Sequence, residues 1–242
     1  MYQEELDKYL AKTGFEKFDP KAVLFDMDGV LYDSMPNHAY SWKHSMQTFG
    51  LEMSEADAYT YEGMRGVETI KLMMKQQRHR DISDEEAQRM YDEKSRVFST
   101  RPRALVMEGV KELMAKIKRD GLTIVVVTGS GQHSLLEKLA QEFEGFVKPE
   151  LIVSSFDVEH GKPNPEPYLK GLGKAGVEPW QAIVVENAPL GVRAGVAAQI
   201  FTLGVNTGPL PNEALLREGA SIVFDTMPML RDHWEDIYRL RG

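Results

Sequence analysis

The stretch 23-VLFDMDGVLYDS-34 decides how the rest of this chain is interpreted. Ala22–Phe25 is a short apolar run without alternation, which is typical of a strand covered on both faces of a parallel sheet. Two aspartates, Asp26 and Asp28, end the run, and Gly29 follows them. Residues two apart on an extended segment project to the same side, so we expect the two carboxylates to be neighbours.

Two neighbouring carboxylates raise each other's pKa unless a cation keeps both ionised. Mg²⁺ takes oxygen ligands and keeps open positions for a substrate phosphate, so it would resolve the conflict between Asp26 and Asp28. A turn with two solvated aspartates is the alternative, because Asp-x-Asp-Gly is a common turn composition. Both interpretations stay open on this motif alone.

Further apolar runs of the same kind follow, and segments with helical spacing of apolar residues separate them. The expected strands are Leu122–Val127, Leu151–Val153, Ala182–Val185, Ile200–Leu203 and Ser221–Phe224. The expected helices are Val110–Arg119, Leu135–Phe143 and Tyr168–Gly173. This strand–helix alternation predicts an α/β fold with a doubly wound, Rossmann-like parallel sheet.

Residues 36–103 interrupt the alternation. The segments PNHAYSWKHSMQTFGL and SDEEAQRMYDEKSRVFS read as helices, and no strong strand separates them. We therefore expect an α/β core domain of residues 1–35 and 104–242, with an inserted α-helical cap domain of residues 36–103. An insertion directly after the first strand lies over the carboxyl ends of the core strands, where open α/β sheets bind ligands.

Composition excludes several classes of function. The formal net charge of −8 argues against nucleic acid or an anionic membrane as a partner, since both require basic surface. The chain has no cysteine, which excludes disulfides, a thiolate nucleophile and a cysteine zinc site. No signal peptide or membrane-spanning apolar run is visible, so we expect a cytoplasmic protein, either a monomer or a weak oligomer. Residues 1–19 read as a short amphipathic extension without an assigned function.

Two further strand ends carry polar residues suited to phosphate. In 125-VVVTGSG-131 a strand ends in Thr128, Gly129 and Ser130, where accessible backbone N–H groups would bind phosphate oxygens. A plain turn between strand and helix is the alternative. In 160-HGKPNPE-166 two prolines restrict the loop around Lys162, which makes its ammonium a fixed counter-charge for a phosphoryl group. A surface lysine beside a helix start is the alternative.

The last of the four strand ends is 184-VVENAPLG-191, where Glu186 and Asn187 supply side-chain oxygens. Asn187 reads either as the N-cap of the following helix or as a ligand, and the two roles are compatible. Each strand end is a modest signal by itself. Their common position makes the set more specific, because the carboxyl ends of parallel strands meet at one edge of a sheet.

The motifs DMDGV, VVVTGS, GKPNPEPY and VVENAPLGVRAG, in this order, resemble those of the haloacid dehalogenase (HAD) superfamily. The resemblance is to the β-phosphoglucomutase-like subgroup with a helical cap, and it covers all but residues 1–19. It implies that Asp26 is a nucleophile that becomes an aspartyl phosphate, and that Asp28 is the general acid and base. It also implies that Asp26 and the backbone carbonyl of Asp28 bind Mg²⁺, and that Lys162 neutralises the phosphoryl group. The residues implied to hold that phosphoryl group are Thr128, Gly129 and Ser130.

The fourth motif departs from the family pattern, because many relatives have two acids where this chain has Glu186 and Asn187. Asn187 would bind substrate or metal through a neutral amide oxygen, so another carboxylate must supply the missing charge. Either Glu186 does so, or Glu62 does, from the cap segment YEGMRG. We expect Glu62 to join the metal ligands when the cap closes. A solvated acid at a helix end is the alternative for Glu62.

The cap motif and ENAPLG together resemble the inorganic pyrophosphatase branch of the subgroup, which makes pyrophosphate the favoured substrate. A sugar phosphomutase or a small sugar-phosphate phosphatase is the alternative. Phosphomutases commonly have an arginine in this cap loop, whereas Gly66 occupies the aligned place here, with Arg65 beside it. His38 matches a histidine of the phosphomutases, and it reads equally well as a packing residue beside Trp42.

Two other classes of protein are weaker alternatives. A non-catalytic binding module would need no nucleophile, and the intact Asp26, Asp28, Thr128 and Lys162 argue against it. A haloacid dehalogenase proper has little use for Asp28 or Mg²⁺.

Overall fold

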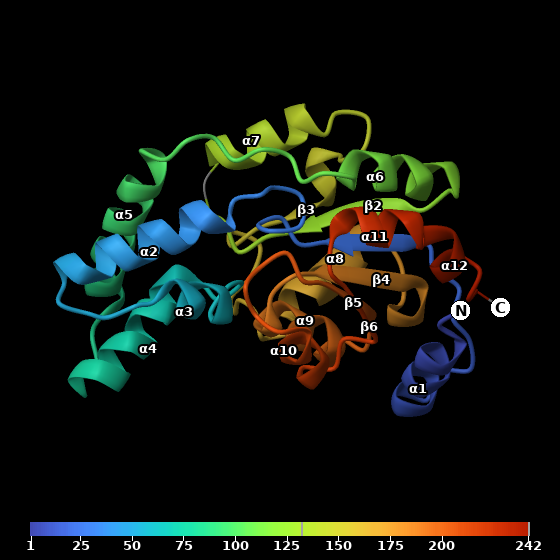
Figure 1. Cartoon of the computed structure of the whole chain (residues 1–242), viewed down its shortest axis with the longest axis horizontal. Helices are drawn as coiled ribbons and strands as arrows, with labels where there is room; N and C mark the ends of the chain where they lie inside the picture. The colour runs from blue at the N-terminus through green and yellow to red at the C-terminus, as the bar shows by residue number, and fades with distance from the viewer. Residues whose placement is uncertain (132, 242) are drawn as a thin grey trace.

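The computed structural model describes residues 1–131 and 133–241. Its centre is a six-stranded parallel sheet with the strand order β3-β2-β1-β4-β5-β6 (Figure 1). The strands are β1 (Ala22–Phe25), β2 (Thr123–Val127), β3 (Ile152–Val153), β4 (Ala182–Glu186), β5 (Phe201–Val205) and β6 (Ile222–Phe224). In the register, Phe25 lies opposite Val126 of β2 and Val185 of β4. The residues that follow these three strands therefore meet at one edge of the sheet.

Helices cover both faces of the sheet, as the absence of alternation in the strands predicts. One face packs against α6 (Val110–Arg119), α7 (His133–Glu142), α11 (Met227–Asp232) and α12 (Trp234–Tyr238). The other face packs against α8 (Glu166–Ala175) and α9 (Pro189–Ala197), with α10 (Asn212–Arg217) beside α9. On β1, Val23 and Phe25 point to the first layer, and Ala22 and Leu24 point to the second. The predicted doubly wound α/β core is confirmed.

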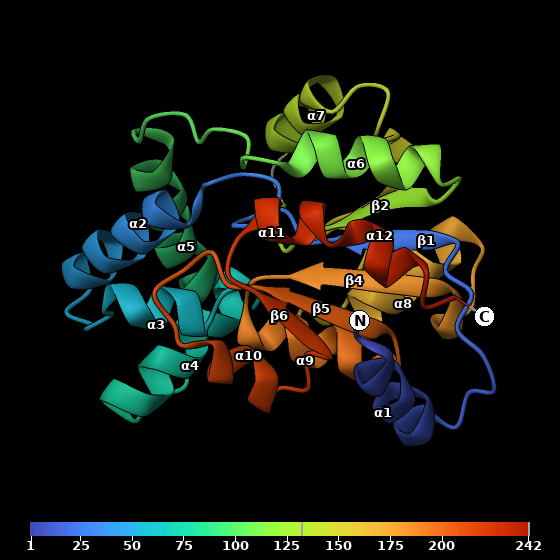
Figure 2. The same ribbon diagram turned by 45° about the vertical axis from the view of Figure 1, so that its right-hand side comes forward.

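Four helices lie between β1 and α6 in the chain, and we call them the cap helices. They are α2 (Met35–Thr48), α3 (Glu55–Thr60), α4 (Gly66–Arg78) and α5 (Asp84–Ser99). They enclose an apolar cluster of their own, which includes Trp42, Met46, Ile70 and Met90. Figures 1 and 2 show these helices beyond the carboxyl ends of the strands. The inserted helical cap is confirmed, and the domain boundaries at residues 36 and 103 stay a prediction.

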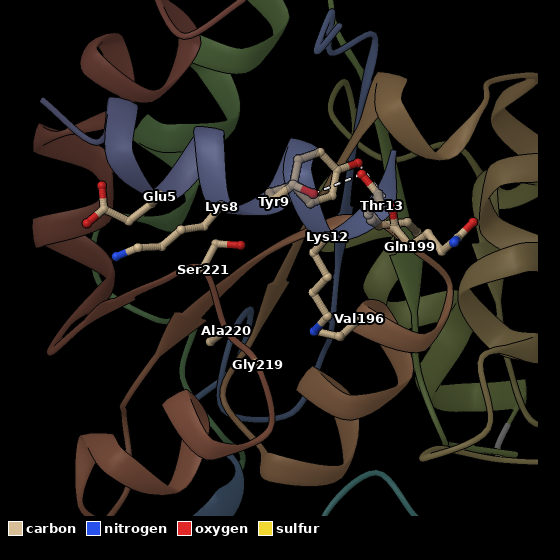
Figure 3. A pocket seen from close by; sticks show the side chains of 11 residues that line it. Glu5, Lys8, Tyr9, Lys12, Thr13, Val196, Gln199, Gly219, Ala220 and Ser221 are labelled. Atoms are coloured by element: carbon tan, nitrogen blue, oxygen red, sulfur yellow. Dashed lines mark hydrogen bonds between the residues drawn. The ribbon is translucent and has the colours of Figure 1, made fainter. Parts of the chain in front are cut away.

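The extension expected at residues 1–19 contains a helix, α1 (Gln3–Thr13), that packs on the core. Leu6 and Tyr9 are its buried residues, and the Tyr9 hydroxyl donates a hydrogen bond to the carbonyl of Gln199 at 3.0 Å. Figure 3 shows a cavity of about 170 Å³ between α1 and the residues that precede β5 and β6. The extension is therefore part of the folded core rather than a loose tail.

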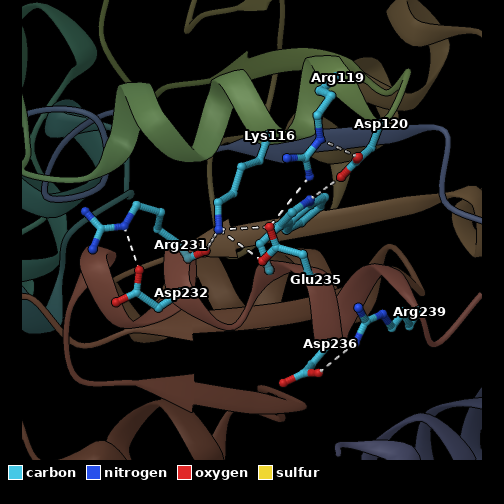
Figure 4. A network of polar contacts seen from close by, with 9 residues as sticks. Lys116, Arg119, Asp120, Arg231, Asp232, Glu235, Asp236 and Arg239 are labelled. Atoms are coloured by element: carbon cyan, nitrogen blue, oxygen red, sulfur yellow. Dashed lines mark hydrogen bonds and ion pairs between the residues drawn. The ribbon is translucent and has the colours of Figure 1, made fainter.

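A network of polar contacts fastens the C-terminal helix α12 to α6 (Figure 4). The Trp234 indole N–H donates to Oδ2 of Asp120 at 2.8 Å, and Nζ of Lys116 donates to Oε2 of Glu235 at 3.0 Å. This network lies at the end of the molecule away from the cap helices. Among the described residues, no helix has the length and apolar character needed to cross a bilayer.

Candidate active site at the carboxyl ends of the strands

Lys162 joins three strand ends through one buried ammonium. Its Nζ lies 2.5 Å from Oδ1 of Asp26, 2.6 Å from Oε1 of Glu186 and 3.1 Å from the carbonyl oxygen of Val127. Burial lowers the pKa of Lys162, but the two carboxylates outweigh that effect and raise it above the ordinary value. Lys162 is therefore charged, and each of its three N–H donors has an acceptor. The fixed counter-charge predicted from the two prolines is present beside the expected nucleophile.

Glu186 is completely buried, and both of its carboxylate oxygens have partners. Besides Lys162, Oε1 accepts a hydrogen bond from the Tyr168 hydroxyl at 2.7 Å. Oε2 accepts from the backbone N–H groups of Asn187 and Ala188 at 3.1 and 3.2 Å. A methyl group at Gly191 would lie only 1.8 Å from Oε1, so the glycine makes room for this carboxylate. Glu186 thus positions Lys162 and the loop after β4.

Asn187 has the features of a ligand rather than of a helix cap. The N-cap of α9 is Ala188, and no side chain makes the capping hydrogen bond there. The Asn187 side chain lies against the turn after β1, since a methyl group at Gly29 would meet its Nδ2 at 2.1 Å. Its Oδ1 is buried and has no hydrogen-bond partner among the described residues. A buried acceptor left unpaired is costly, and a bound cation would satisfy it.

Asp26 shows the electrostatic conflict expected from the DMDG motif. Burial raises its pKa to about 7, Lys162 opposes the rise, and the nearby Glu186 and Asp28 add to it. Its Oδ1 is held by Lys162, and its side chain is 7% exposed. The raised pKa leaves part of Asp26 protonated near neutral pH, and a second positive charge would increase the ionised fraction. The residues around Asp26 therefore fit a divalent cation.

Asp28 is held from the side of the cap helices. The Ser34 hydroxyl donates to its Oδ1 at 2.6 Å, and Nε2 of His38 lies 3.2 Å from the same oxygen. Burial would raise the pKa of Asp28, but His38, Ser34 and Lys94 together lower it below its usual value. The side chain is hydrogen-bonded and borders a cavity, and its lowered pKa keeps it ionised near neutral pH.

Lys94, which the sequence analysis did not select, contacts the ring nitrogen of His38 that faces away from Asp28. Nζ of Lys94 lies 2.9 Å from Nδ1 of His38, and Lys94 is only 4% exposed. Because an ammonium can only donate, Nδ1 accepts and Nε2 carries the proton that is donated to Asp28. Burial and Lys94 lower the pKa of His38, which agrees with a neutral ring. His38 therefore contacts Asp28 and Lys94 through both ring nitrogens, in addition to any packing role beside Trp42.

The Lys94 ammonium lies within 6 Å of three aromatic rings, those of Trp42, Tyr91 and Phe98. Burial lowers its pKa to about 8, while Glu62 and Asp28 raise it. A lysine among polar neighbours in a helix is typical of a solvent-exposed residue. The segment around Lys94 therefore did not indicate that this side chain is buried beside His38. The signal lies in the fold, which brings α5 across α2.

Glu62 reaches the site from the loop between α3 and α4. Burial raises its pKa to about 8, Asp28 and Asp26 add to the rise, and Lys94 and Lys162 oppose it. The same loop rests on the core, because a methyl group at Gly63 would lie 3.0 Å from Cδ of Lys162. Nη1 of Arg65 donates to the carbonyl of Glu159 at 2.7 Å. The loop is closed over the strand ends and brings a third acid toward Asp26 and Asp28.

A small cavity of about 50 Å³ remains between the cap loop and the core. Its lining includes the side chains of Asp28, His38, Glu62, Lys94 and Ser130, whereas Asp26 and Lys162 do not border it. Thr128, directly after β2, is buried and does not line this cavity. Its Oγ1 accepts a hydrogen bond from the N–H of Ser130 at 3.0 Å. The described residues contain no group of three or more His, Cys, Asp or Glu side chains arranged around a common metal position. The expected ligand set does not require one, since it includes an amide oxygen and a backbone carbonyl.

Comparisons with known proteins agree with the site. The family model described as "Haloacid dehalogenase-like hydrolase" matches residues 23–205. A solved structure described as "Putative beta-phosphoglucomutase from Bacteroides vulgatus" is 48% identical, has a TM-score of 0.95 and aligns over 100% of this chain and 98% of its own.

Curated proteins of several activities are also similar. The "Phosphorylated carbohydrates phosphatase" of Thermotoga maritima is 30% identical over 83% of this chain and 92% of its own length. A "Putative pyrophosphatase" of Caldanaerobacter subterraneus is 27% identical over 91% of this chain and 94% of its own length. Strand order, strand-end residues and the matched family model lead to one conclusion: the chain belongs to the haloacid dehalogenase-like hydrolase family.

Proposed function

We propose that the protein is a Mg²⁺-dependent phosphohydrolase that splits inorganic pyrophosphate through an aspartyl phosphate on Asp26. The observation that carries this proposal is the position of Glu62. This carboxyl group of the cap is close enough to Asp26 and Asp28 for their charges to raise its pKa. An acid there repels both aspartates unless a cation lies among them. Asn187 supports the same location, because its buried Oδ1 has no partner among the described residues.

The chain's own residues divide the work of the reaction. An Asp26 oxygen attacks the phosphorus of one phosphoryl group. Lys162 offsets the negative charge of Asp26 and of that phosphoryl group. Asp28 is ionised before substrate binds, so it would first accept the proton of the hydrogen pyrophosphate anion and then give it to the oxygen that leaves. It would later take a proton from the water that hydrolyses the aspartyl phosphate. Thr128, Gly129 and Ser130 would orient the phosphoryl oxygens.

Bound Mg²⁺ would be held by Asp26, the backbone carbonyl of Asp28, Asn187 and Glu62. Its chemistry there would be to keep these neighbouring carboxylates ionised and to offset phosphoryl charge. The pKa of Glu62, raised to about 8, means that the acid is largely protonated near pH 7 without such a cation. Metal binding should therefore release protons.

The shape of the cap loop favours a small substrate. A methyl group at Gly66 would lie 2.1 Å from Cε2 of Tyr91, so this ring occupies the space that a longer side chain at position 66 would need. The cavity between Glu62 and the strand ends is about 50 Å³. Pyrophosphate presents only phosphoryl groups, whereas a sugar phosphate also needs room and partners for its hydroxyls.

The alternative is hydrolysis or isomerisation of a sugar phosphate. The names of the relatives support it, since a carbohydrate phosphatase and a structure titled as a phosphoglucomutase are both similar to this chain. The contact between His38 and Asp28 also supports it, because the family resemblance matches His38 to a histidine of the phosphomutases.

The test is phosphate release by the purified protein with Mg²⁺, comparing pyrophosphate with a panel of sugar phosphates. We expect a strong preference for pyrophosphate, and a loss of about 10⁴-fold or more in Asp26→Asn. Glucose 1-phosphate is assayed for isomerisation in parallel. A preference for sugar phosphates, or isomerisation, would refute pyrophosphate as the substrate and leave the role of Asp26 intact. Activity retained in Asp26→Asn would refute the aspartyl phosphate.

A further inference from the structure

A second cavity, of about 350 Å³, lies at the hinge between the cap helices and the core. We call it the hinge cavity. Its polar and charged lining includes Asp28, Ser34, Arg101, Arg103, Lys138 and Glu142. These residues come from the turn after β1, from the segment that connects α5 to α6, and from α7. Figure 1 shows that connecting segment passing near α7 on its way to α6.

The hinge cavity adjoins the small cavity at the strand ends. Asp28, Phe98 and Leu135 line both cavities. The Phe98 ring also packs on His38, with 4.4 Å between the ring centroids. The general acid is therefore accessible from two sides, and two apolar side chains separate the hinge cavity from the space beneath the cap loop.

Positive charge predominates in the hinge cavity, although the whole chain carries a net charge of −8. Three cations line it, Arg101, Arg103 and Lys138, against two acids, Asp28 and Glu142. Arg103 pairs with Glu142 at 2.9 Å. Neither Arg101 nor Lys138 forms an ion pair with another described residue that lines this cavity.

Arg101 adds an observation that points to a ligand. Its Nε and Oδ1 of Asn187 are the two buried side-chain polar atoms without a hydrogen-bond partner among residues 1–131 and 133–241. The guanidinium stacks on the Tyr40 ring at 3.9 Å, which restricts where it can move. A guanidinium held in place with an unsatisfied donor is suited to a phosphate oxygen.

We propose that the hinge cavity is an anion site that receives the phosphate released beside Asp28. This proposal rests on the proposed function. When an Asp26 oxygen bonds to one phosphorus of pyrophosphate, the bridging P–O bond breaks. Its oxygen takes back, through Asp28, the proton that the hydrogen pyrophosphate anion carried into the site. The product is an aspartyl phosphate and one orthophosphate anion next to Asp28. In the hydrolysis of a sugar monophosphate the leaving sugar would be neutral and would gain nothing from Arg101 and Lys138.

Binding is tested without turnover, by titrating orthophosphate into the Mg²⁺-loaded protein and following backbone amide resonances. We expect saturable shifts in residues 99–104 and 135–142, in addition to shifts in residues 128–130. In the double variant Arg101→Gln/Lys138→Gln the first set should disappear while the second persists. Shifts confined to residues 128–130 in the wild type would overturn the hinge site. So would hinge shifts that survive in the double variant.

Product inhibition tests the role in the reaction. In Lys138→Gln, which changes an exposed residue and leaves folding intact, the inhibition constant for orthophosphate should rise about tenfold, the effect of one charge-assisted contact. Lys170→Gln, an exposed lysine on α8, is the matched control and should leave the constant unchanged. An equal constant in both variants would overturn the release role.

The two proposals fail in distinguishable ways. Pyrophosphate hydrolysis without shifts at the hinge overturns the hinge site alone. Hinge shifts without pyrophosphate hydrolysis overturn the proposed function, and with it the role of the cavity in releasing a phosphate leaving group.

Discussion

Two glutamates border the site, one from the core and one from the cap, and they are held in different ways. Glu186, at the end of β4, is completely buried and has hydrogen-bond partners for both oxygens. Glu62, in the loop before α4, is partly exposed, and its surroundings raise its pKa to about 8. The core glutamate is satisfied by folding alone. The ionised form of the cap glutamate is disfavoured where it lies, and we propose that a bound cation is what stabilises it.

The largest effect is expected at the core glutamate. Glu186→Gln removes one of two charges opposite the buried Lys162 ammonium, and breaking such a pair costs about 3 kcal/mol of unfolding free energy. Chemical denaturation monitored by circular dichroism measures the loss. A change below about 0.5 kcal/mol would show that Glu186 does not stabilise the fold, since that is the usual range of surface substitutions.

At the cap glutamate we expect the reverse pattern. Glu62→Gln should raise the unfolding free energy near pH 7 in the absence of metal, because the amide needs no proton to be accommodated among the aspartates. The same substitution should reduce Mg²⁺ affinity or turnover by about 100-fold, as expected for a metal ligand. Glu68→Gln, on α4 of the same cap, is the matched control and should behave like the wild type. Equal, small effects of the two substitutions on a Mg²⁺ titration of activity would refute the metal role of Glu62.

The smallest effect concerns pH. Without metal, Asp26 and Glu62 keep protons up to pKa values of about 7 and 8, whereas the unfolded chain loses them near the ordinary values of 3.8 and 4.5. The folded state then binds more protons than the unfolded state, so stability should fall as pH rises from about 4.5 to 8. Solvent screening reduces the share of the partly exposed Glu62, and the lowered pKa of His38 opposes the fall at pH values below about 6.5.

Thermal unfolding at several pH values, with and without Mg²⁺, checks this slope. Mg²⁺ should flatten it, since a bound cation keeps both carboxylates ionised. Glu62→Gln should flatten it in the absence of metal. A stability that rises over the same interval would contradict the pKa shifts of both groups.

The core half of the site was predictable from sequence because parallel strands impose their own geometry. Once β1, β2 and β4 are recognised as buried strands, their register brings Asp26 and Thr128 to one edge. Lys162 was predictable for a different reason, since two prolines and a resemblance pointed to its loop. The site roles assigned to these residues, including metal binding, stay predictions, as do the domain boundaries.

The cap half was less predictable because helix-to-helix packing leaves no local signature. Lys94 contacts His38 although 56 positions separate them, and its own segment reads as an ordinary polar helix. Tyr168 was predicted only as the start of a helix, and the fold reveals its hydrogen bond to Glu186. The alternative that Asn187 caps α9 is wrong, because Ala188 is the N-cap and Glu186 takes the amides of the turn.

The close approach of Tyr91 to Gly66 also restricts the mutational routes by which this cap could acquire a new specificity. An arginine introduced at position 66 alone would collide with the ring, so that substitution should be deleterious before it is useful. A smaller residue at position 91 has to come first, or the two changes have to arrive together. Redesign of the protein toward larger substrates therefore depends on the order of two substitutions. The first should be made at Tyr91 in α5, and the second at Gly66.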